Sequence, residues 1–582
     1  MDMQASPIYE FNGFRLIPSE RMLLRNGGMV VPLTDKVFDL LLLLVRNCGQ
    51  LVDKEQMLSA VWPERFVEEH NLTVSMSALR KALGETHDKH EYIETVPKHG
   101  YRFIADVRKL SSQRGIQKPK PAGTLHSLAV LPFVNAGADP DADYLCDGIT
   151  ESIIASLSQL SQLRVMAFST VFRYKQIDID PREVGRALGV RSILVGRVSH
   201  VGGNLIVRTE LVDVTTGWQL WSEQYDRKPS DVLALQHQIA QEISENLRLH
   251  LTGEQKRLLA KRYTANTEAY HLYLKGRYNW NKRTPSGTAR AVEYFEQAIR
   301  LDSKYALAYA GLADSYNLMA GNSGSPPRET FAKAKAAALK ALAIDDSLAE
   351  AHTSLSLVRY LFDWEWSAAE QGFKRTIELN PNYATAHHWY GEYLVLMRRF
   401  DEGFKELMTA HELDPLSLPI NADLGQYYFF SRQYEQAVEQ LNKTLELEPN
   451  FVRAVALLAW TYEQMGNYEA AIAKFEQATA LSGSRTLIVA GLGHAHAISG
   501  NREEAIKILA ALKEEAGRFY ISPYEIAVIH TALREPEQAF DCLDQACEDH
   551  SVWLSWLDVD PRLDSLRRDP RFTQLVQRVR RD

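Results

Sequence analysis

Small side chains that return every 34 residues constrain the fold of the C-terminal half of this chain. They form two columns: Gly391, Gly425, Ala459, Gly493 and Ala527, then Gly403, Ala437, Ala471, Ala505 and Ala539. A third column with the same period is larger and apolar: Leu407, Leu441, Phe475, Leu509 and Leu543. Small residues let two helices cross closely, so each unit is expected to be a pair of packed helices.

This unit resembles the tetratricopeptide repeat, which also has a proline at the turn after its second helix. Turn prolines stand at 381, 415 and 449, in the pairs Asn-Pro, Asp-Pro and Glu-Pro. Five units keep strict register, and earlier units shifted by insertions bring the expected number to seven or eight. Because such a repeat buries its apolar face only against its neighbours, residues 253–582 are expected to form an α-solenoid with a C-terminal cap. The resemblance implies a protein or peptide partner on the concave surface.

Aromatic residues are dense in this half: Trp364, Trp366, Trp389, Tyr390, Tyr393, Tyr427, Tyr428, Phe429 and Phe430. They suit a peptide groove, but rings at repeat-internal positions usually pack in the core, and we expect most of these to do so. His387 and His388 are adjacent, so their side chains diverge on a helix and do not predict a metal pair.

Residues 71–103 predict a helix followed by a β-hairpin. The apolar residues of the helix recur at helical spacing: Leu72, Met76, Leu79 and Leu83. Residues 92–96 and 101–104 predict two strands around a turn at 97–100. The other faces of the helix carry hydroxyl and cationic side chains, which suit a major groove, and the basic hairpin can reach a phosphate or the minor groove.

The run LRKAL followed by YIETVPKHGYRF resembles the end of the OmpR/PhoB-type winged-helix domain, over roughly residues 11–107. Strands expected in 8–33 and helices expected at 35–47 and 53–62 precede it in the order that this family has. The turn at 97–99 departs from the family's Arg-Gly-x run, so the side chain that enters the minor groove stays open. The resemblance implies that residues 1–109 bind double-stranded DNA.

The resemblance also implies which side chains read bases. Asn71, Thr73 and Ser77 would face base edges. Val74 would touch a thymine methyl group or belong to the core, and Tyr101 would contact DNA or, more in keeping with its position, pack the wing against the helix. Short polar side chains read bases less decisively than a bidentate arginine does. Specificity is therefore expected to be modest for one copy and to gain from a dimer on repeated half-sites.

Cationic side chains in the same stretch are expected to hold the DNA backbone. The resemblance implies that phosphates are contacted by Arg80, Lys81 and Arg102. It also places Lys98 or His99 at the tip of the wing. The whole chain has a net charge of −8, so affinity for DNA must come from this local cluster rather than from the overall field.

Residues 110–124 predict a linker, because Ser, Gln, Lys, Gly and Pro dominate without apolar periodicity. CadC-like regulators, which share the N-terminal domain, place a transmembrane helix after it. The longest apolar run here, at 37–45, is too short to span a bilayer, so we expect no membrane contact. Four scattered cysteines form neither a disulfide framework nor a zinc set, which favours a reducing cytoplasm.

Residues 125–252 alternate between apolar strands and amphipathic helices, which predicts an α/β sandwich with a partly antiparallel sheet. A long helix is expected at 231–251. The stretch from AVLPFVN to AFSTVF, with ILVGRV later, resembles the TolB amino-terminal-like domain. Asp147 and Glu151 could mark a reaction site, but acids near a helix start more often cap it. Without a phosphate-binding loop, a dinucleotide fingerprint or HExxH, we predict no catalytic, cofactor or metal site.

The expected fold is multidomain, α+β and all-α: a winged helix, an α/β sandwich domain and a repeat α-solenoid. We predict a cytoplasmic, sequence-specific DNA-binding transcriptional regulator of the signal-transduction class and no enzyme. Only seven residues precede the first strand, so the family's link to phosphorelays rests on the DNA-binding domain, without a receiver. Two alternatives stay open: a protein-interaction scaffold, and a metabolite- or nucleotide-responsive sensor using the central domain. The repeats would bind a partner or control homo-oligomerisation.

Overall fold

The computed structural model divides the chain into two compact units, Met1–Ala122 and Gly123–Asp582. It describes residues 8–12, 14–18, 22–25, 29–31, 35–61, 69–83, 85, 92–96, 99–105, 107–110, 126–136, 143–175, 180–201, 203–228, 231–247, 249, 251–261, 263–282, 284–322, 326–482, 486–516, 518 and 520–580. Most of the predicted linker, together with Lys98, lies outside these residues.

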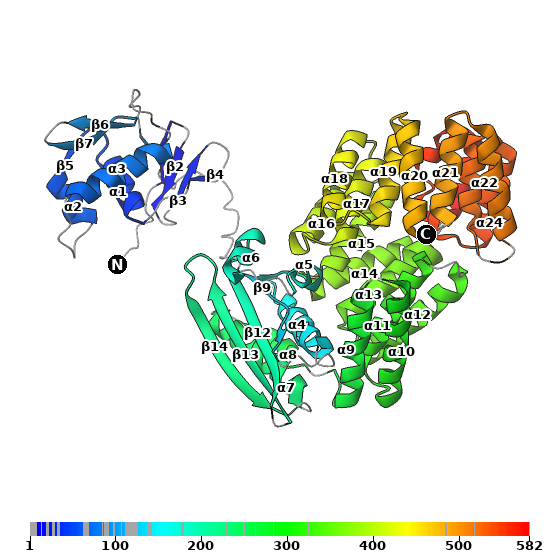
Figure 1. Ribbon diagram of the computed structural model, residues 1–582, viewed down its shortest axis with the longest axis horizontal. Coiled ribbons are helices and arrows are strands. Elements are labelled where there is room, and N and C mark those ends of the chain that lie inside the picture. Colours follow the sequence, from blue (N-terminus) through cyan, green and yellow to red (C-terminus); the bar gives the residue numbers. More distant parts are fainter. Residues whose placement is uncertain are drawn as a thin grey trace. The chain divides into compact units, whose positions relative to one another are not determined.

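The N-terminal unit joins two small antiparallel sheets to three helices (Figure 1). The first sheet has the order β4-β3-β2-β1-β8. Its strands are β1 Ile8–Phe11, β2 Phe14–Ile17, β3 Met22–Arg25, β4 Met29–Val31 and β8 Arg108–Leu110. The predicted start of the linker at 110 is thus the end of β8, a strand that pairs with β1.

The second sheet and the helices follow the predicted order. The sheet has the order β5-β7-β6, with β5 Leu51–Asp53, β6 Ile93–Val96 and β7 Gly100–Phe103. The helices are α1 Asp35–Arg46, α2 Lys54–Val61 and α3 Glu69–Leu83. A Cβ atom at Gly100 would lie 2.1 Å from the carbonyl oxygen of Val52, so this glycine permits the close pairing of β7 with β5.

The hydrophobic core of this unit confirms the apolar stripe expected on α3. Leu72, Met76, Leu79 and Leu83 are all at most 2% exposed. They share one core with rings from both sheets, among them Phe11 and Phe103, whose centroids lie 5.1 Å apart. The winged-helix architecture predicted for this part of the chain is therefore confirmed.

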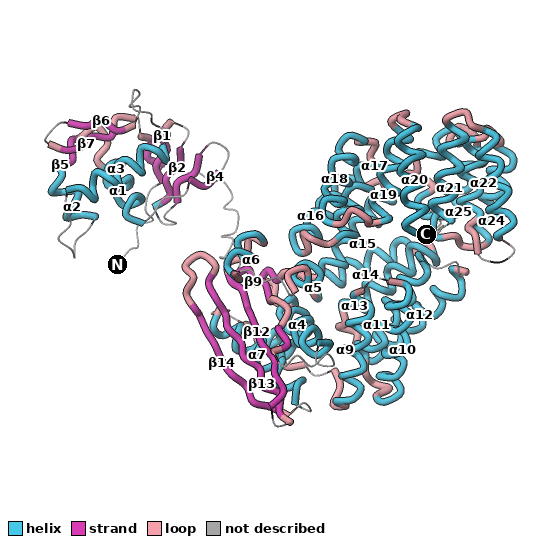
Figure 2. The backbone as a smooth tube through the Cα atoms, viewed as in Figure 1, coloured by secondary structure: helices cyan, strands magenta, loops and turns pink. Residues whose placement is uncertain are grey.

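The second unit begins with a mixed sheet of order β11-β9-β12-β13-β14. Its strands are β9 His126–Val130, β11 Leu163–Val165, β12 Ser192–Val201, β13 Asn204–Asp213 and β14 Gln219–Arg227, with β10 Val134–Asn135 beside β12. Along this order the first three strands are parallel and the last three antiparallel, which agrees with the predicted partly antiparallel sheet. Figure 2 shows β12, β13 and β14 side by side.

Five helices accompany this sheet in the described part: α4 Asp143–Ser158, α5 Phe168–Phe172, α6 Pro181–Ala187, α7 Val232–Asn246 and α8 Gly253–Leu259. The expectation of one helix over 231–251 was wrong at its end, because α7 stops at Asn246. Thr252 then opens α8: its side chain accepts from the Gln255 backbone while the Gln255 side chain accepts from the Thr252 backbone. Such a capping box satisfies backbone donors at a new helix start.

Sixteen helices follow as eight antiparallel pairs within the described residues (Figure 1). The first four pairs are α9 Thr267–Asn281 with α10 Pro285–Leu301, α11 Ala306–Asn322 with α12 Pro327–Ile344, α13 Ala349–Val358 with α14 Trp366–Leu379, and α15 Ala384–Leu396 with α16 Phe400–Leu413. The others are α17 Leu418–Phe430 with α18 Tyr434–Leu447, α19 Val452–Gln464 with α20 Tyr468–Ser482, α21 Thr486–Ile498 with α22 Arg502–Glu515, and α23 Pro523–Ala532 with α24 Pro536–Glu548. The repeat solenoid is therefore confirmed.

The periodic columns lie where the helices of one pair cross. A Cβ atom on Gly391 would sit 2.7 Å from Leu407 and 3.1 Å from the carbonyl oxygen of Gly403. At Gly425 it would sit 2.6 Å from Leu441. A larger side chain at Gly391 or Gly425 would therefore push the two helices of its pair apart.

The sheet part and the repeats of this unit are joined by polar contacts. Glu151 on α4 accepts from Arg277 at 2.6 Å and from Asn281 at 3.1 Å, both on the first repeat helix, α9. The amide of Asn382, between α14 and α15, donates to the carbonyl oxygens of Ser158 and Leu163 at 2.8 and 2.9 Å. The sheet part thus covers the start of the solenoid. The predicted domain boundary at residue 252 stays a prediction.

The last segment of the chain was expected to cap the final repeat, and it also runs back to earlier repeats. It contains two short 3₁₀ helices, η5 Val552–Trp556 and η6 Pro561–Leu566, and α25 Pro570–Val579. We call residues 551–580 the return segment. Ser555 donates to the carbonyl oxygen of Tyr360 at 3.1 Å, and Trp366 donates to the carbonyl oxygen of Val579 at 2.7 Å.

One buried carboxyl group of the repeats predicts how the stability of this unit depends on pH. Burial raises the pKa of Glu525, on α23, from 4.5 to about 7, although Thr486 and Arg562 act in the opposite direction. The unfolded chain loses this proton at lower pH than the folded chain, so the free energy of unfolding should fall as pH rises from 4.5 to 7. The difference amounts to about 3 kcal/mol.

Glu525→Gln removes this ionisation and should raise the midpoint of thermal unfolding at pH 8, with little change at pH 4.5. Scanning calorimetry at both values measures the effect. Glu514→Gln, at an exposed position of α22, is the matched control and should change neither midpoint. An equal gain at both pH values would show that the ionisation of Glu525 is not responsible.

Candidate nucleic-acid interface

Helix α3 turns two of the predicted base-reading side chains outward. Thr73 and Ser77 are exposed and stand one helical turn apart, so they share a face beside the buried stripe. Asn71, Val74 and Lys81 also lie on α3, but their side chains lie outside the described part of the structure. The contacts of these five residues with DNA stay predictions.

Arg80, predicted to bind phosphate, connects α3 to the wing. Its Nη2 atom donates to the carbonyl oxygen of Ile93 at 3.0 Å and to Oγ1 of Thr95 at 2.7 Å, both on β6. Its Nε atom lies 3.3 Å from a carboxylate oxygen of Glu85. The guanidinium also stands 5.9 Å from the centroid of the Tyr101 ring. Arg80 therefore fixes the position of the wing beside the helix, whatever else it contacts.

Glu85 is a residue that the sequence interpretation missed. Its side chain is buried, and it accepts from the backbone amides of Tyr92 at 2.6 Å and Ile93 at 2.9 Å. It thus links the end of α3 to the first strand of the wing through both Arg80 and the backbone. Its position two residues after Leu83, the last residue of α3, could have suggested a polar cap, but its partners lie seven and eight residues farther along the chain.

The wing itself carries the remaining predicted residues. His99 is exposed at the turn before β7. Arg102 donates to Glu94 across the hairpin at 3.0 Å, and its side chain keeps 38% of its surface exposed, so it is within reach of solvent and ligand. Tyr101 is buried, as expected for a ring that packs the wing against the helix.

The two acids of α4 considered as a reaction site have structural partners. Asp147 is buried and binds Lys175 through both carboxylate oxygens, at 2.8 and 2.7 Å. Burial raises the pKa of Asp147 to about 6, and Lys175 limits this rise. Glu151 joins α4 to Arg277 and Asn281. Neither acid is a helix cap, because both lie inside α4 and serve ion pairs.

A second cluster of titratable groups lies in the repeats. His388, Glu392 and Asp423 bring ligand atoms within 4.8 Å of one another. Arg453 lies among them, with Nη2 2.5 Å from Asp423 and 3.4 Å from Glu392. Although burial would raise the pKa of Asp423, Arg453 and His388 hold it at about 2. The guanidinium thus already supplies positive charge to these carboxylates.

The aromatic residues considered for a peptide groove are mostly core residues. Six of the nine are at most 8% exposed: Trp366, Tyr390, Tyr393, Tyr427, Phe429 and Phe430. His387 and His388 have different partners, Glu406 and Asp423, both at 2.6 Å. The predicted divergence of the two histidines is therefore confirmed.

The return segment contacts the first helices of several repeats, which are the helices that face the inside of such a solenoid. Asp560 accepts from Tyr524 of α23 at 2.7 Å, and Arg562 stands 4.8 Å from the ring centroid of Trp460 on α19. At the other end Arg580 donates to the carbonyl oxygen of Leu396 on α15. This inner surface is therefore covered in part by the chain's own C-terminal residues.

Among the helices that the structure describes, none combines the length and the apolar character needed to cross a bilayer.

Three family profiles match the chain. "Transcriptional regulatory protein, C terminal" matches residues 28–103, "HilA/YgeH-like transcriptional regulator, second domain" matches 124–242, and "Tetratricopeptide repeat" matches 422–486 and 456–520. The TolB amino-terminal-like resemblance of the central part stays a prediction, because the matching profile there is the HilA/YgeH-like one.

Curated relatives agree with these profiles. A Rhizobium meliloti protein named as an adenylate cyclase is 34% identical over 236 residues, 40% of each chain. Transcriptional regulator HilA of Salmonella typhimurium is 27% identical over 395 residues, 66% of this chain and 67% of HilA. Transcriptional activator CadC of Escherichia coli is 31% identical over 110 residues, 19% of this chain and 21% of CadC. The chain thus spans less than half of the first relative and two thirds of HilA.

An exposed hydroxyl face on α3, a wing held by Arg80 and a repeat solenoid agree with these matches. The chain therefore contains an OmpR/PhoB-type DNA-binding domain, a HilA-like second domain and tetratricopeptide repeats, and it is similar to the transcriptional regulator HilA.

Proposed function

We propose that the protein regulates transcription by reading promoter DNA with α3 and the wing. The observation that carries this proposal is the exposed face of Thr73 and Ser77 beside a wing that Arg80 holds in place. A helix of this kind enters the major groove, where hydroxyl groups reach base edges. Asn71 and Val74, on the same helix, also contact bases in this proposal. Phosphates are bound by Lys81 and by the wing residues Lys98, His99 and Arg102.

Arg80 and Tyr101 have a different role in this proposal, which is to position the wing. Arg80 bonds to Ile93 and Thr95, and its guanidinium lies beside the buried ring of Tyr101. Both residues therefore act mainly by fixing the angle between helix and wing. Since a helix and a wing must meet neighbouring grooves together, a change in this angle weakens binding even where no direct DNA contact is lost.

The second unit supplies control in this proposal. Tetratricopeptide repeats suggest a protein partner, and the return segment covers part of their inner surface. A partner peptide would therefore either displace this segment or bind the outer helices. Contacts between copies of the chain through the repeats would also raise affinity for paired half-sites by raising the effective concentration of the second winged helix.

We further propose that the protein is no enzyme and acts in the cytoplasm, where bacterial promoter DNA lies. Asp147 and Glu151 are committed to ion pairs, which supports a structural role for the acids of α4. The relative named as a cyclase favours one specific alternative, formation of cyclic AMP. Incubation of the purified chain with ATP and Mg²⁺ or Mn²⁺ tests it, and cyclic AMP formed in proportion to protein would overturn this part of the proposal.

The DNA-binding proposal predicts a steep dependence on salt. Gel shifts of the full chain on promoter DNA selected from a random pool should show log affinity falling with log salt, with a slope near −0.9 for each phosphate contact. Thr73→Ala and Ser77→Ala should each lower affinity for the selected site roughly fivefold, about 1 kcal/mol, with little effect on unrelated DNA.

Lys81→Ala should lower affinity for both kinds of DNA equally and make the slope about one unit shallower. Arg46→Ala, which removes an exposed charge at the end of α1, is the matched control and should leave affinity unchanged. Binding that responds to none of the three α3 variants would place the DNA on another surface.

The proposal that Arg80 positions the wing gives a separate prediction. Arg80→Lys keeps the charge but loses the planar fork that reaches Ile93, Thr95 and Glu85 together. It should lower the stability of the N-terminal unit by about 2 kcal/mol and weaken DNA binding nearly as much as Arg80→Ala. Calorimetry and gel shifts on both variants measure this. If Arg80→Lys bound DNA with the affinity of the wild type, Arg80 would be a phosphate contact and not a positioning residue.

A further inference from the structure

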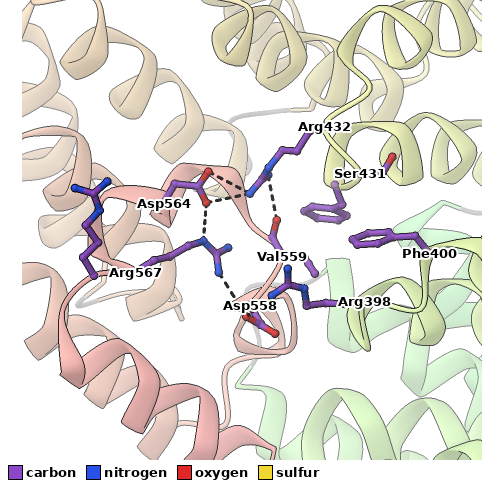
Figure 3. A pocket seen from close by; sticks show the side chains of 10 residues that line it. Arg398, Phe400, Ser431, Arg432, Asp558, Val559, Asp564 and Arg567 are labelled. Atoms are coloured by element: carbon purple, nitrogen blue, oxygen red, sulfur yellow. Dashed lines mark hydrogen bonds and ion pairs between the residues drawn. The ribbon is translucent and has the colours of Figure 1, made fainter.

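A pocket of about 510 Å³ lies where the return segment meets two successive repeats (Figure 3). Arg398, Phe400, Phe430 and Arg432 line it from the repeats, and Asp558, Asp564, Arg567 and Arg568 line it from the return segment. The two sides are more than a hundred residues apart in the chain. An occupant of this pocket would therefore touch both the repeats and the segment that covers them.

The pocket has an excess of positive charge. Four arginines and two aspartates line it, which gives a formal charge of +2 (4 − 2). Asp564 binds Arg432 at 2.9 Å and Arg567 at 2.7 Å, so these two cations have a carboxylate partner (Figure 3). Asp558 is already shared between Arg567 at 3.5 Å and Arg580 at 3.3 Å.

Two of the guanidinium groups have little or no such compensation. Arg398 has Asp558 as its nearest carboxylate, at 3.9 Å, and keeps 62% of its side chain exposed. Arg568 is exposed and forms no ion pair or hydrogen bond with the residues that the structure describes. Donors without acceptors around a concave surface suit an anionic ligand, because guanidinium groups bind phosphate and carboxylate in bidentate fashion.

The repeat geometry explains why the two repeat arginines converge. In six successive repeats a residue in the turn just after the first helix has a positive φ, between 59° and 92°: Trp364, Arg398, Arg432, Gly466, Gly500 and Arg534. Gly466 and Gly500 present no side chain at this position. Arg398 and Arg432 present a guanidinium from neighbouring repeats towards the same part of the return segment.

Part of the pocket wall is apolar. Phe430 is buried and Phe400 is half-buried at the pocket wall, and Val559 lies opposite on the return segment. Arginine also stacks on planar rings. A volume of about 510 Å³ lies within the range of small-molecule sites, which is about 300–1,000 Å³. Charge, rings and size together select a ligand that carries both phosphate groups and a planar ring.

We propose that this pocket binds a mononucleotide, with its phosphates on Arg398 and Arg568 and its base against Phe400 and Phe430. Because the ligand bridges both sides, it holds the return segment onto the repeats. This inference goes beyond DNA binding and does not depend on it. It also places nucleotide recognition in the repeats and not in the central domain.

Isothermal titration of the full chain tests the proposal, with ATP, pyrophosphate and citrate as separate ligands. ATP should bind and should raise the midpoint of thermal unfolding. Arg398→Ala combined with Arg568→Ala should weaken it about tenfold or more, because two charge-assisted contacts are lost. Arg534→Ala is the matched control, since Arg534 holds the same repeat position with φ 60° but does not line the pocket.

The three ligands and the double variant distinguish the possible results of this experiment. Pyrophosphate binding as tightly as ATP would overturn the assignment of the ring to Phe400 and Phe430, and citrate binding as tightly would overturn selectivity for phosphate. ATP binding that the double variant leaves unchanged would place the nucleotide elsewhere and overturn the proposal. No heat from any ligand would also overturn it. DNA affinity measured on the same double variant should equal that of the wild type. A failure of the nucleotide proposal can therefore be told apart from a failure of the DNA-binding proposal.

Discussion

A helix pair of the 34-residue type can bury its apolar face only against another element, and the second unit depends on this constraint. Within the solenoid, small residues such as Gly391 and Gly403 let helices approach until backbone and side chains touch. At the start of the solenoid the sheet part supplies the covering surface, with Gly148 against Leu274 and Glu151 bonded to Arg277. At the end the return segment does so. The solenoid is thus covered by its own chain at both ends.

The return segment does more than cap the last repeat. It contacts the first helices of several repeats, from Tyr360 to Tyr524, and so restricts the inner surface that repeats of this type offer to partners. A regulator whose partner surface is already occupied can respond to whatever strengthens or releases the occupant. The arginine-lined pocket lies at this contact, so a ligand bound there would touch both the repeats and the return segment.

In the N-terminal unit the corresponding constraint is the angle between α3 and the wing. Arg80 and Glu85 hold it through contacts at 2.6 to 3.3 Å with each other and with residues 92 and 93 at the start of the wing. The net charge of the chain is −8, so the few cations of this surface must act locally. Among the described residues, Arg102 on the wing keeps 38% of its side chain exposed, and Thr73 and Ser77 are exposed on α3, which makes this surface suitable for DNA.

The sequence by itself determined the elements and their order. The spacing of Leu72, Met76 and Leu79 predicted the buried stripe of α3, and the period of 34 predicted the helix pairs, because both patterns reflect contacts between residues close in the chain. Only the tertiary structure decided what depends on distant residues. Arg80 turns to the wing, and Arg398 meets Asp558 across the solenoid. No local pattern encodes such contacts, since they join residues that only the folded chain brings together.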